Sequence, residues 1–576
     1  MKIKIATGFL SLLAGLLLVM PSCKRYYDPP PYFEEAGDTV KLSARKVLVI
    51  GIDGAVGSEY KALQAPVLEG MKAHSKYSWE SVSDEVTTSA ASWKTLMTGI
   101  SYGRHSIADS TFIYTQAPGG DEHGEIRSYP SFFNYILSSS RPDLKTVFIS
   151  QWGNLLNRLV PEVESKVLVQ SDAAAKDSAV NRLKNTNADL MIVHFNSPAV
   201  AGKTDAFSAT SATYREAVMK VDGYLGEIMT ALKARPEYNK SEEWLVIVTG
   251  THGGNGKTHG GSSAQETNVF SFYYNENMKP TELTRNGAFS GVQLKGRDAG
   301  VIRAQVHEDG GLYNPGRGEQ TVQVRVKGTA GYYPHFFSKT DRWPSTPGWS
   351  MFSAGGNWAI SVRSTTSGEQ RIQGTAPTVF DNQWHTITIV FADSASKRWL
   401  RRYSDGVRFS QTEITGLYNN GGSIESASPL TLGWQADPGM PAVDFYAADV
   451  MIFNTALTDD EIVQSQCLKD ISTHTKYNNL IGFWPGNDGF GSSFRNLAPG
   501  KSTSFHLEGG FQWQSLQDLP CSVSPVTGDA SRKSLLVKSV DLVSTTLYWL
   551  RIPANSNWGL EGATWLQQYE IEFVKI

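Results

Sequence analysis

Four side chains of this sequence are of types that bind metal ions or attack electrophiles. The carboxylate of Asp53 directly follows the apolar run 46–52, and the hydroxyl of Ser89 stands at the start of a helical segment. The imidazoles of His252 and His259 lie beside glycines in a later part of the chain. Carboxylates and imidazoles are common zinc ligands, and a metal turns a serine hydroxyl into a nucleophile. The four positions therefore indicate chemistry of the metal-assisted displacement type.

The elements that must position these side chains alternate between strands and helices from residue 44 to about 280. The strand candidates are the nearly continuous apolar runs 46–52, 145–150, 189–195 and 244–249. Such runs are typical of parallel strands that are covered on both faces. Apolar residues at helical spacing from Tyr214 to Leu232, closed by Pro236, predict a helix before the last strand. We expect an α/β layered domain whose ligands sit at the carboxyl ends of its strands.

The order and spacing of the segments 46–54, 88–99, 189–203 and 244–261 resemble the alkaline phosphatase superfamily. The resemblance is to its phosphodiesterase/nucleotide pyrophosphatase branch and covers about half of the chain. Members hold two zinc ions that clamp the attacking and leaving oxygens of a displacement at phosphorus. The resemblance implies a mostly parallel sheet and a Thr or Ser nucleophile.

Five residues match positions of the family's motifs. Asp53 matches the carboxylate ligand after the first strand, and Ser89 matches the nucleophile. His105 matches a histidine usually found after the nucleophile helix. His252 matches the histidine of the Asp-His-Gly motif, and His259 matches the later Thr-His-Gly-Gly ligand. The resemblance thus implies that Asp53, His252 and His259 are residual metal ligands.

Three ligand positions of the same motifs carry residues that do not bind metals. The family's Asp-x-x-Gly-His segment aligns with Ala199 and Lys203, so a carboxylate has become a methyl and an imidazole an ammonium. The aspartate before the first histidine has become Thr251. A cation near two divalent ions is repelled by about 4 kcal/mol per pair of unit charges at an effective dielectric of 20. These departures argue against a metal pair.

The remaining ligands do not complete either metal site. One metal would keep only His259, and the other would keep Asp53, Ser89 and His252. Catalytic zinc normally has three protein ligands and an open position. We therefore predict a catalytically inactive domain without a cofactor, with zinc or another divalent metal bound at most at low occupancy. The alternative is a metal-dependent phosphodiesterase, phosphatase or sulfatase-like hydrolase that uses Ser89.

Each retained residue also has a purely structural interpretation. In this interpretation Asp53 caps the loop after its strand, and Ser89 is the N-cap of its helix. Backbone hydrogen bonds then satisfy His252 and His259. Lys203 offers a further alternative, because it makes the site more positive and suited to an anion.

From about 285 to 520 the pattern changes to short alternating strands and glycine-rich turns. Period-two alternation in 321–327, 358–363 and 384–391 is typical of a β-sandwich. The strand at 384–391, and a strand with a short capped helix within 447–462, resemble laminin-G-like, concanavalin A-like jelly rolls. We assign 284–520 to such a sandwich. The resemblance implies binding of a glycan or glycoconjugate, while no calcium pattern is legible.

Three tryptophans are candidates for stacking on a sugar. Trp343, Trp349 and Trp358 lie in or beside the loop-rich stretch 336–358. An exposed indole stacks well on the apolar face of a sugar. The alternative is that these rings pack in the core between the two sheets.

The first residues predict the compartment. A basic start and the apolar run 5–20 precede Cys23, with a small residue directly before it, which resembles a bacterial lipoprotein signal. We expect a signal peptide at 1–22, lipidation of Cys23 and a proline-containing tether at 23–43. The expected location is the cell envelope of a Bacteroidetes-like bacterium, lipid-anchored in the outer membrane. The periplasmic and surface faces both remain open.

Net charge, domain boundaries and two cysteines complete the prediction of how the chain is organised. A net charge of −3 gives no electrostatic reason to expect nucleic acid. The first part of the α/β domain is assigned to 44–283, and 521–576 resembles its closing segment, with a separate small domain as the alternative. Cys467 and Cys521 either pair or remain free thiols. The sequence thus predicts a lipid-anchored envelope protein with an inactive α/β domain and a carbohydrate-binding-type sandwich.

Overall fold

The computed structural model describes residues 43–113, 129–287, 289–296, 300–340, 346–433, 443–526 and 531–573. The predicted signal peptide, the tether with Cys23, and Trp343 lie outside the described residues. Within the described ranges, no helix has both the length and the apolar character needed to cross a membrane.

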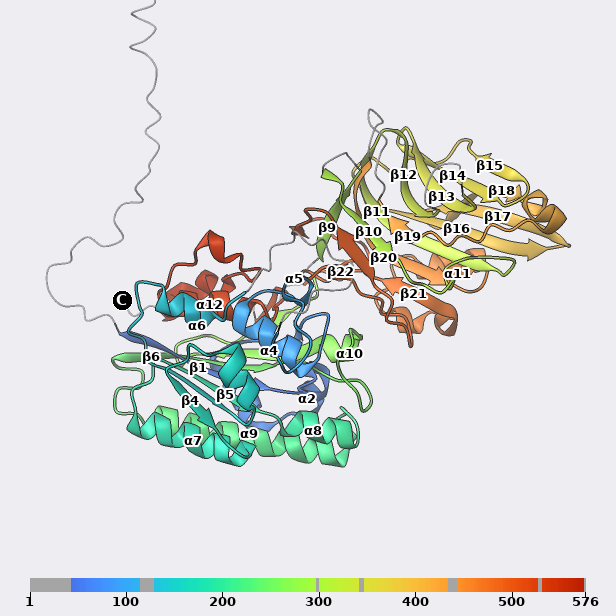
Figure 1. Cartoon of the computed structure of the whole chain (residues 1–576). Coiled ribbons are helices and arrows are strands. Elements are labelled where there is room, and N and C mark those ends of the chain that lie inside the picture. Colours follow the sequence, from blue (N-terminus) through green and yellow to red (C-terminus); the bar gives the residue numbers. More distant parts are fainter. Residues whose placement is uncertain are drawn as a thin grey trace, which may run out of the picture. The chain divides into compact units, whose positions relative to one another are not determined.

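A nine-stranded sheet forms the centre of the α/β domain, in the order β25-β8-β2-β7-β6-β1-β5-β3-β4 (Figure 1). Its strands are β1 (Ala44–Ile52), β2 (Ser75–Val82), β3 (Thr146–Ser150), β4 (Ser165–Leu168), β5 (Leu190–Phe195), β6 (Glu242–Gly250), β7 (Asn268–Tyr274), β8 (Thr281–Thr284) and β25 (Arg532–Ser534). Strand β7 is antiparallel to both β2 and β6. The pairs β1–β5, β3–β5, β3–β4, β2–β8 and β8–β25 are parallel, so the predicted mostly parallel α/β sheet is confirmed.

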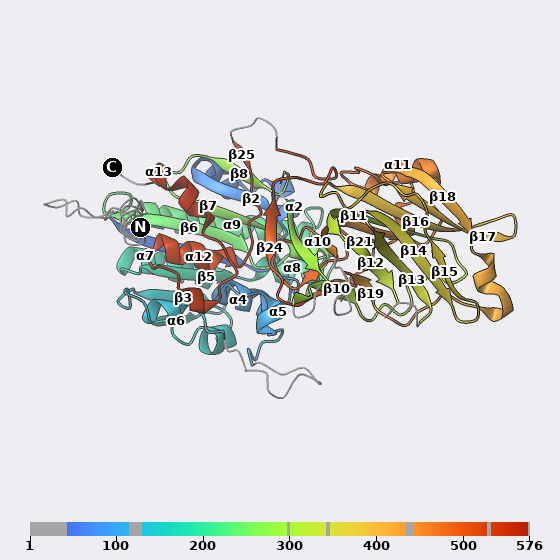
Figure 2. The same cartoon turned by 90° about the horizontal axis from the view of Figure 1, so that it is seen from above.

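Helices cover both faces of this sheet (Figures 1 and 2). Helices α7 (Asp172–Asn185) and α9 (Ala212–Lys233) lie on one face, and α4 (Ser89–Thr98), α6 (Phe132–Leu137) and α12 (Asp541–Trp549) lie on the other. The remaining helices of the domain are α2 (Gly57–Leu63), α3 (Pro66–Met71), α5 (Tyr102–His105), α8 (Ser197–Thr204), α10 (Ala264–Thr267) and α13 (Glu570–Phe573).

The apolar run of β1 explains this layering, because its side chains alternate between two cores. Leu48 and Ile50 pack in the cluster that holds Val218 of α9. Val47 and Val49 pack in the cluster that holds residues of α4 and α12. A strand buried on both faces needs apolar residues at every position, and this requirement accounts for the continuous run in the sequence.

Helix α9 follows the predicted apolar spacing. Ser211 caps it by accepting a hydrogen bond from the N–H of Tyr214 at 3.2 Å. Its buried side chains recur at helical spacing and include Val218, Leu225 and Leu232. The amphipathic pattern therefore fixes which face of the helix meets the sheet.

The chain returns to the α/β sheet at its C-terminal end. β25 pairs in parallel with β8, through Lys533 opposite Leu283. Val543 and Leu547 of α12 belong to the same buried cluster as Val47 of β1. The C-terminal segment thus supplies both an edge strand and part of the core of this domain.

The residues between these two parts form two antiparallel sheets, in the orders β15-β14-β13-β12-β19-β10-β23-β22 and β18-β17-β16-β11-β20-β9-β24. The strands are β9 (Phe289–Lys295), β10 (Arg303–Val306), β11 (Gln320–Ala330), β12 (Tyr332–Lys339), β13 (Gly348–Ala354), β14 (Asn357–Ser364), β15 (Gly368–Ile372), β16 (His385–Ser394), β17 (Lys397–Ser404), β18 (Val407–Glu413), β19 (Leu430–Leu432), β20 (Val443–Phe453), β21 (Leu480–Trp484), β22 (Ser493–Phe494), β23 (Phe505–Glu508) and β24 (Trp513–Leu516). The predicted all-β sandwich is confirmed. The helix α11 (Asp459–Ser465) follows β20 and carries the expected cap, with Thr458 and Glu461 bonded reciprocally.

The core of the sandwich corrects the prediction of sugar-stacking tryptophans. Trp349 and Trp358 are both 0% exposed and belong to the cluster that fills the space between the sheets. The indole N–H of Trp358 donates to Ser404 Oγ at 2.9 Å. A ring enclosed on both faces cannot stack on a sugar, so the core interpretation is right for these two residues.

A disulfide joins Cys467 and Cys521 across a sequence separation of 54 residues. It fastens the segment after α11 to the segment after β24. Of the two alternatives that the sequence left open, the structure has the paired form.

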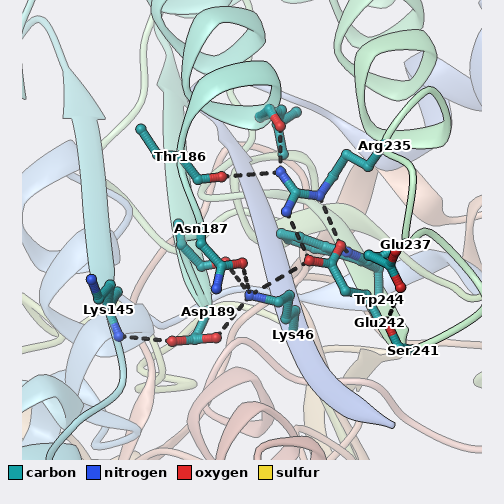
Figure 3. A network of polar contacts seen from close by, with 12 residues as sticks. Lys46, Lys145, Thr186, Asn187, Asp189, Arg235, Glu237, Ser241, Glu242 and Trp244 are labelled. Carbon is teal, nitrogen blue, oxygen red and sulfur yellow. Dashed lines mark hydrogen bonds and ion pairs between the residues drawn. The ribbon is translucent and has the colours of Figure 1, made fainter.

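A polar network lies at the amino end of β1 (Figure 3). Nζ of the buried Lys46 donates to Asn187 Oδ1 and Asp189 Oδ1, each at 2.8 Å. Arg235, after α9, donates to both carboxylate oxygens of Glu242 at 2.8 Å. The network ties the starts of β1 and β6 to the loop before β5 and to the end of α9, at the end of the sheet opposite Asp53.

Candidate functional site

The candidate site forms where β1, β5 and β6 end. The N–H of Asp53 donates to the Phe195 carbonyl at 2.9 Å, and the N–H of Thr251 donates to the Ile52 carbonyl at 3.0 Å. These bonds bring three strand ends together, as expected for ligands in an α/β sheet. Asp53 and Thr251 consequently touch in the buried floor of the site.

The carboxylate of Asp53 is surrounded by protein donors. Oδ1 accepts hydrogen bonds from Trp93 Nε1 at 2.9 Å and from Thr251 Oγ1 at 2.7 Å. Oδ2 lies 3.2 Å from Nε2 of His194. Asp53 is only 2% exposed, and the protein itself supplies both hydrogen bonds to Oδ1 and the imidazole beside Oδ2.

The surroundings of Asp53 favour its ionised form. Burial by itself would raise the pKa of this carboxyl, but the imidazoles of His194 and His252 and the hydroxyl of Thr251 outweigh burial. The pKa is therefore held well below its usual value. The side chain remains a carboxylate at physiological pH.

Ser89 presents its hydroxyl to the site from the first turn of α4. Thr88 is the N-cap of this helix, because its Oγ1 accepts from the N–H of Ala91 at 3.2 Å. The interpretation of Ser89 as the N-cap is therefore wrong. Its Oγ instead lies 3.1 Å from Nε2 of His252.

The hydrogen bonds of His252 define its tautomer. Nδ1 lies 2.8 Å from the Gly253 carbonyl, which can only accept, so Nδ1 carries the proton. Burial lowers the pKa of His252 to about 4, so the ring is neutral at physiological pH. Nε2 then has a free lone pair, and the hydroxyl of Ser89 donates to it.

His259 lies against His252. The two rings are stacked, with centroids 4.2 Å apart and planes 19° apart. Nδ1 of His259 donates to the Thr87 carbonyl at 2.9 Å, and burial lowers the pKa of this imidazole as well. Both histidines thus make backbone hydrogen bonds, in agreement with the structural alternative, and both remain beside Ser89 and Asp53.

The altered ligand positions Ala199 and Lys203 lie on α8. Ala199 is 1% exposed, and its Cα would lie 2.5 Å from a Cβ atom on Gly54, which has a φ of +72°. Helix α8 therefore packs directly against the backbone after Asp53. Lys203 is exposed, and its ammonium contributes to lowering the pKa of both His252 and His259.

The side chains present do not fit a pair of zinc ions. Oδ1 of Asp53 accepts two protein hydrogen bonds, and Oδ2 has the His194 imidazole at 3.2 Å. Across the described ranges, no group of three or more His, Cys, Asp or Glu side chains is arranged to hold a metal ion. Ala199 and Thr251 supply no carboxylate at the positions where the resembled family has one.

His105 belongs to a separate buried network. Its Nδ1 accepts from the N–H of Ile107 at 3.0 Å, so Nε2 carries the proton and donates to Thr95 Oγ1 at 3.0 Å. The Thr95 hydroxyl in turn donates to Asp84, which also accepts from the N–H of Tyr102 at 2.6 Å. His105 thus braces the turn after α4.

The structure brings most of the sequence-predicted residues together. Ser89, His252 and His259 form one contiguous group, and Asp53 and Thr251 form another directly beside it. Sequence reasoning missed the two other partners of Asp53, which are Trp93 and His194. His194 had a signal, since it is the one polar residue of β5. Trp93 had none, because a buried indole in a helix is ordinary core.

Part of the chain matches a known family. Residues 310–463 match the model of the concanavalin A-like lectin/glucanases superfamily. This stretch begins before β11 and ends in α11, so the predicted jelly-roll resemblance is confirmed for the sandwich. No curated protein matches the chain in sequence.

Several solved structures are similar to the chain. A 2-O GAG sulfatase is 12% identical, with 41% of this chain and 65% of that chain covered and a TM-score of 0.32. Murine ectonucleotide pyrophosphatase/phosphodiesterase 5 is 15% identical, with 36% and 57% covered and a TM-score of 0.28. A protein in the alkaline phosphatase superfamily from Vibrio parahaemolyticus is 14% identical, with 43% and 64% covered and a TM-score of 0.32. The chain thus spans less than two thirds of the length of each of these three proteins.

Proposed function

We propose that this chain is a lipid-anchored protein of the bacterial cell envelope, held in the outer membrane through Cys23. Its sandwich binds a glycan or glycoconjugate. Its α/β domain does not hydrolyse phosphate or sulfate esters by a two-metal mechanism and serves as a scaffold. The observation that carries the last point is the enclosure of the Asp53 carboxylate by Trp93, Thr251 and His194.

Zinc would have to compete with the two hydrogen-bond donors to Asp53, Trp93 and Thr251. Hydrogen bonds to a charged group contribute about 1.5–3 kcal/mol each, and the carboxylate would have to exchange such bonds for a metal ligand. The exchange would still leave an incomplete ligand set, because Thr251 and Ala199 offer no carboxylate. The buried donors therefore stabilise the Asp53 carboxylate in place of a cation.

Support for the glycan comes from the match of residues 310–463 to a lectin-type family. It does not come from Trp349 and Trp358, which are buried. A glycan array with the purified protein tests this part of the proposal. Binding to one class of glycan is the expected outcome, and an array without any hit removes the binding role.

Two measurements test the scaffold role. They are the zinc content of the purified protein after dialysis and its rate of ester hydrolysis. The purified protein should retain no stoichiometric zinc and should not cleave aryl phosphate monoesters, aryl phosphate diesters or aryl sulfates. Zinc-dependent turnover that disappears in Ser89→Ala would instead establish the alternative, a metal-dependent ester hydrolase.

The anchor is tested separately by fractionation. The wild-type chain should partition with membranes, and Cys23→Ser should appear in the soluble fraction. If the membrane fraction held as much Cys23→Ser as wild-type protein, lipidation at this residue would be contradicted.

A further inference from the structure

Going beyond the scaffold role proposed for the α/β domain, we infer that this domain has one metal-free activity, in which Ser89 and His252 form a nucleophile–base pair that cleaves carboxylic esters. The pair stands on one hydrogen bond, from Ser89 Oγ to His252 Nε2 at 3.1 Å. This distance is within the range over which a general base takes a proton from a nucleophile. No metal enters the arrangement.

The polarity of this hydrogen bond is the one that a base requires. The Gly253 carbonyl accepts from Nδ1 of His252 at 2.8 Å, so the proton of the neutral ring sits on Nδ1. Nε2 consequently has the lone pair that accepts the Ser89 proton. The opposite tautomer would lose the bond to the carbonyl and would make the ring a donor to Ser89.

The base is held in this orientation by its neighbours. The N–H of Gly253 donates to the Glu266 carbonyl at 2.7 Å, and a Cβ on Gly253 would lie 2.2 Å from the Gln265 carbonyl oxygen. Position 253 is therefore restricted to glycine. These contacts hold the Gly253 carbonyl in place beside Nδ1 of His252. The stacked ring of His259, 4.2 Å away, limits tilting of His252 from the other side.

Backbone donors lie beside the nucleophile. The first N–H groups of an α-helix have no intrahelical acceptor, and α4 has ten residues. The N–H of Ala91 donates to Thr88 Oγ1 at 3.2 Å, and the N–H groups of Ser89 and Ala90 belong to the same first turn, in which no intrahelical acceptor exists. Two such donors suit the single oxyanion of a tetrahedral acyl intermediate. They are a poorer match for the several charged oxygens of a phosphate or sulfate ester.

The reaction balances with water as the only co-reactant. Ser89 Oγ forms a bond to the acyl carbon of the ester while its proton passes to His252 Nε2. The bond from the acyl carbon to the alkoxy oxygen breaks, and His252 returns the proton to the leaving alcohol. Water then gives a proton to His252 and attacks the acyl carbon, the bond from the acyl carbon to Ser89 Oγ breaks, and His252 returns the proton to Oγ. The products are a carboxylic acid and the free serine hydroxyl.

The test uses the full mature protein with and without a chelator. The wild type is incubated with a fluorophosphonate probe, and the labelled residue is located by mass spectrometry of peptides. Hydrolysis of p-nitrophenyl acetate is followed in parallel for Ser89→Ala, for His252→Gln and for the control Ser92→Ala. Ser92 lies on the same helix and is buried without a partner for its hydroxyl within the described residues.

We expect labelling at Ser89 that the chelator does not reduce. Ser89→Ala should abolish both labelling and hydrolysis, and His252→Gln should lower the rate by about 10²–10⁴-fold, the range for loss of a general base. Ser92→Ala should retain both. The inference is overturned if the folded wild type is not labelled, if Ser89→Ala hydrolyses the ester at the wild-type rate, or if hydrolysis needs added zinc.

Discussion

Thr251 and Asp53 form the contact on which the proposed absence of a metal pair depends most closely. The Thr251 hydroxyl donates to Asp53 Oδ1 at 2.7 Å in a fully buried setting. Thr251→Asp would put a second carboxylate there, and two like charges about 4 Å apart repel by about 4 kcal/mol at an effective dielectric of 20. We expect a loss of this order in the free energy of unfolding at neutral pH, measured by urea denaturation.

The matched control is Thr251→Ser, which keeps the hydroxyl donor. This variant should lose no more than about 1 kcal/mol, as expected for a missing methyl group. If Thr251→Asp were as stable as the wild type without added metal, the buried contact between Asp53 and residue 251 would be contradicted.

The free energy of unfolding is expected to depend on pH through Asp84. Burial and the neighbouring Glu85 carboxylate raise the pKa of Asp84 to about 7 from an ordinary value of 3.8. The stability that it contributes is complete below the unfolded pKa and is lost as the pH rises to about 7. Asp84→Asn keeps an acceptor for the N–H of Tyr102 and cannot ionise.

Denaturation curves at several pH values test this point. The stability of Asp84→Asn relative to the wild type should increase from acidic pH up to about pH 7 and then level off. A difference that is constant over this range would exclude a raised pKa for Asp84.

The residues of the site were only partly predictable from sequence. Asp53, Ser89, His252 and His259 follow recognisable strand ends, helix starts and glycine motifs, so their positions could be named. The donors to Asp53 could not be named in full, because Trp93 reaches it from a helix and leaves no local pattern. Which donors meet a buried carboxylate is decided by the packing of the layers.

At the scale of elements, the network in Figure 3 holds helix α9 to the sheet. Arg235 and Glu242 are 11% and 9% exposed and form a two-pronged ion pair. Removing one partner of a buried pair costs about 3–5 kcal/mol when the remaining charge is left alone. Glu242 keeps Lys46 Nζ at 3.9 Å, so Arg235→Met should lower the free energy of unfolding by about 3 kcal/mol, the low end of this range, measured by denaturant titration.

Arg215, on α9 itself, provides the control. It is exposed and bonds to the Ala209 carbonyl, so Arg215→Met should change stability by no more than about 0.5 kcal/mol. Similar effects of the two substitutions would contradict the structural role of the Arg235–Glu242 pair.

The elements of the sheet divide into those with and without a sequence signal. The four predicted apolar runs correspond to β1, β3, β5 and β6, which are buried on both faces. β2 was not predicted, because polar residues, among them Lys76, interrupt its apolar pattern. This lysine is buried, and its Nζ lies 2.8 Å from Glu572, almost 500 residues later in the chain. In the sequence, a buried charged residue with so distant a partner cannot be told from an exposed one.

At the scale of the whole molecule, the Cys467–Cys521 bond closes a loop of 54 residues by sequence separation. A cross-link of this kind restricts the unfolded chain and stabilises a protein by about 2–4 kcal/mol. The double variant Cys467→Ser/Cys521→Ser should lose this amount of unfolding free energy in the sandwich and should no longer respond to a reductant. A wild type whose denaturation curve is unchanged by reductant would contradict a stabilising disulfide.

The central claim is that protein donors, and not metal ions, satisfy the carboxylate at the end of β1. Crystals grown with excess zinc and measured at the zinc absorption edge test it most directly. We predict no anomalous density within coordination distance of Asp53, His252 or His259, and hydrogen bonds from Trp93 and Thr251 to Asp53 as described. A zinc ion bound to Asp53 and His252, with the Thr251 hydroxyl displaced, would contradict the account.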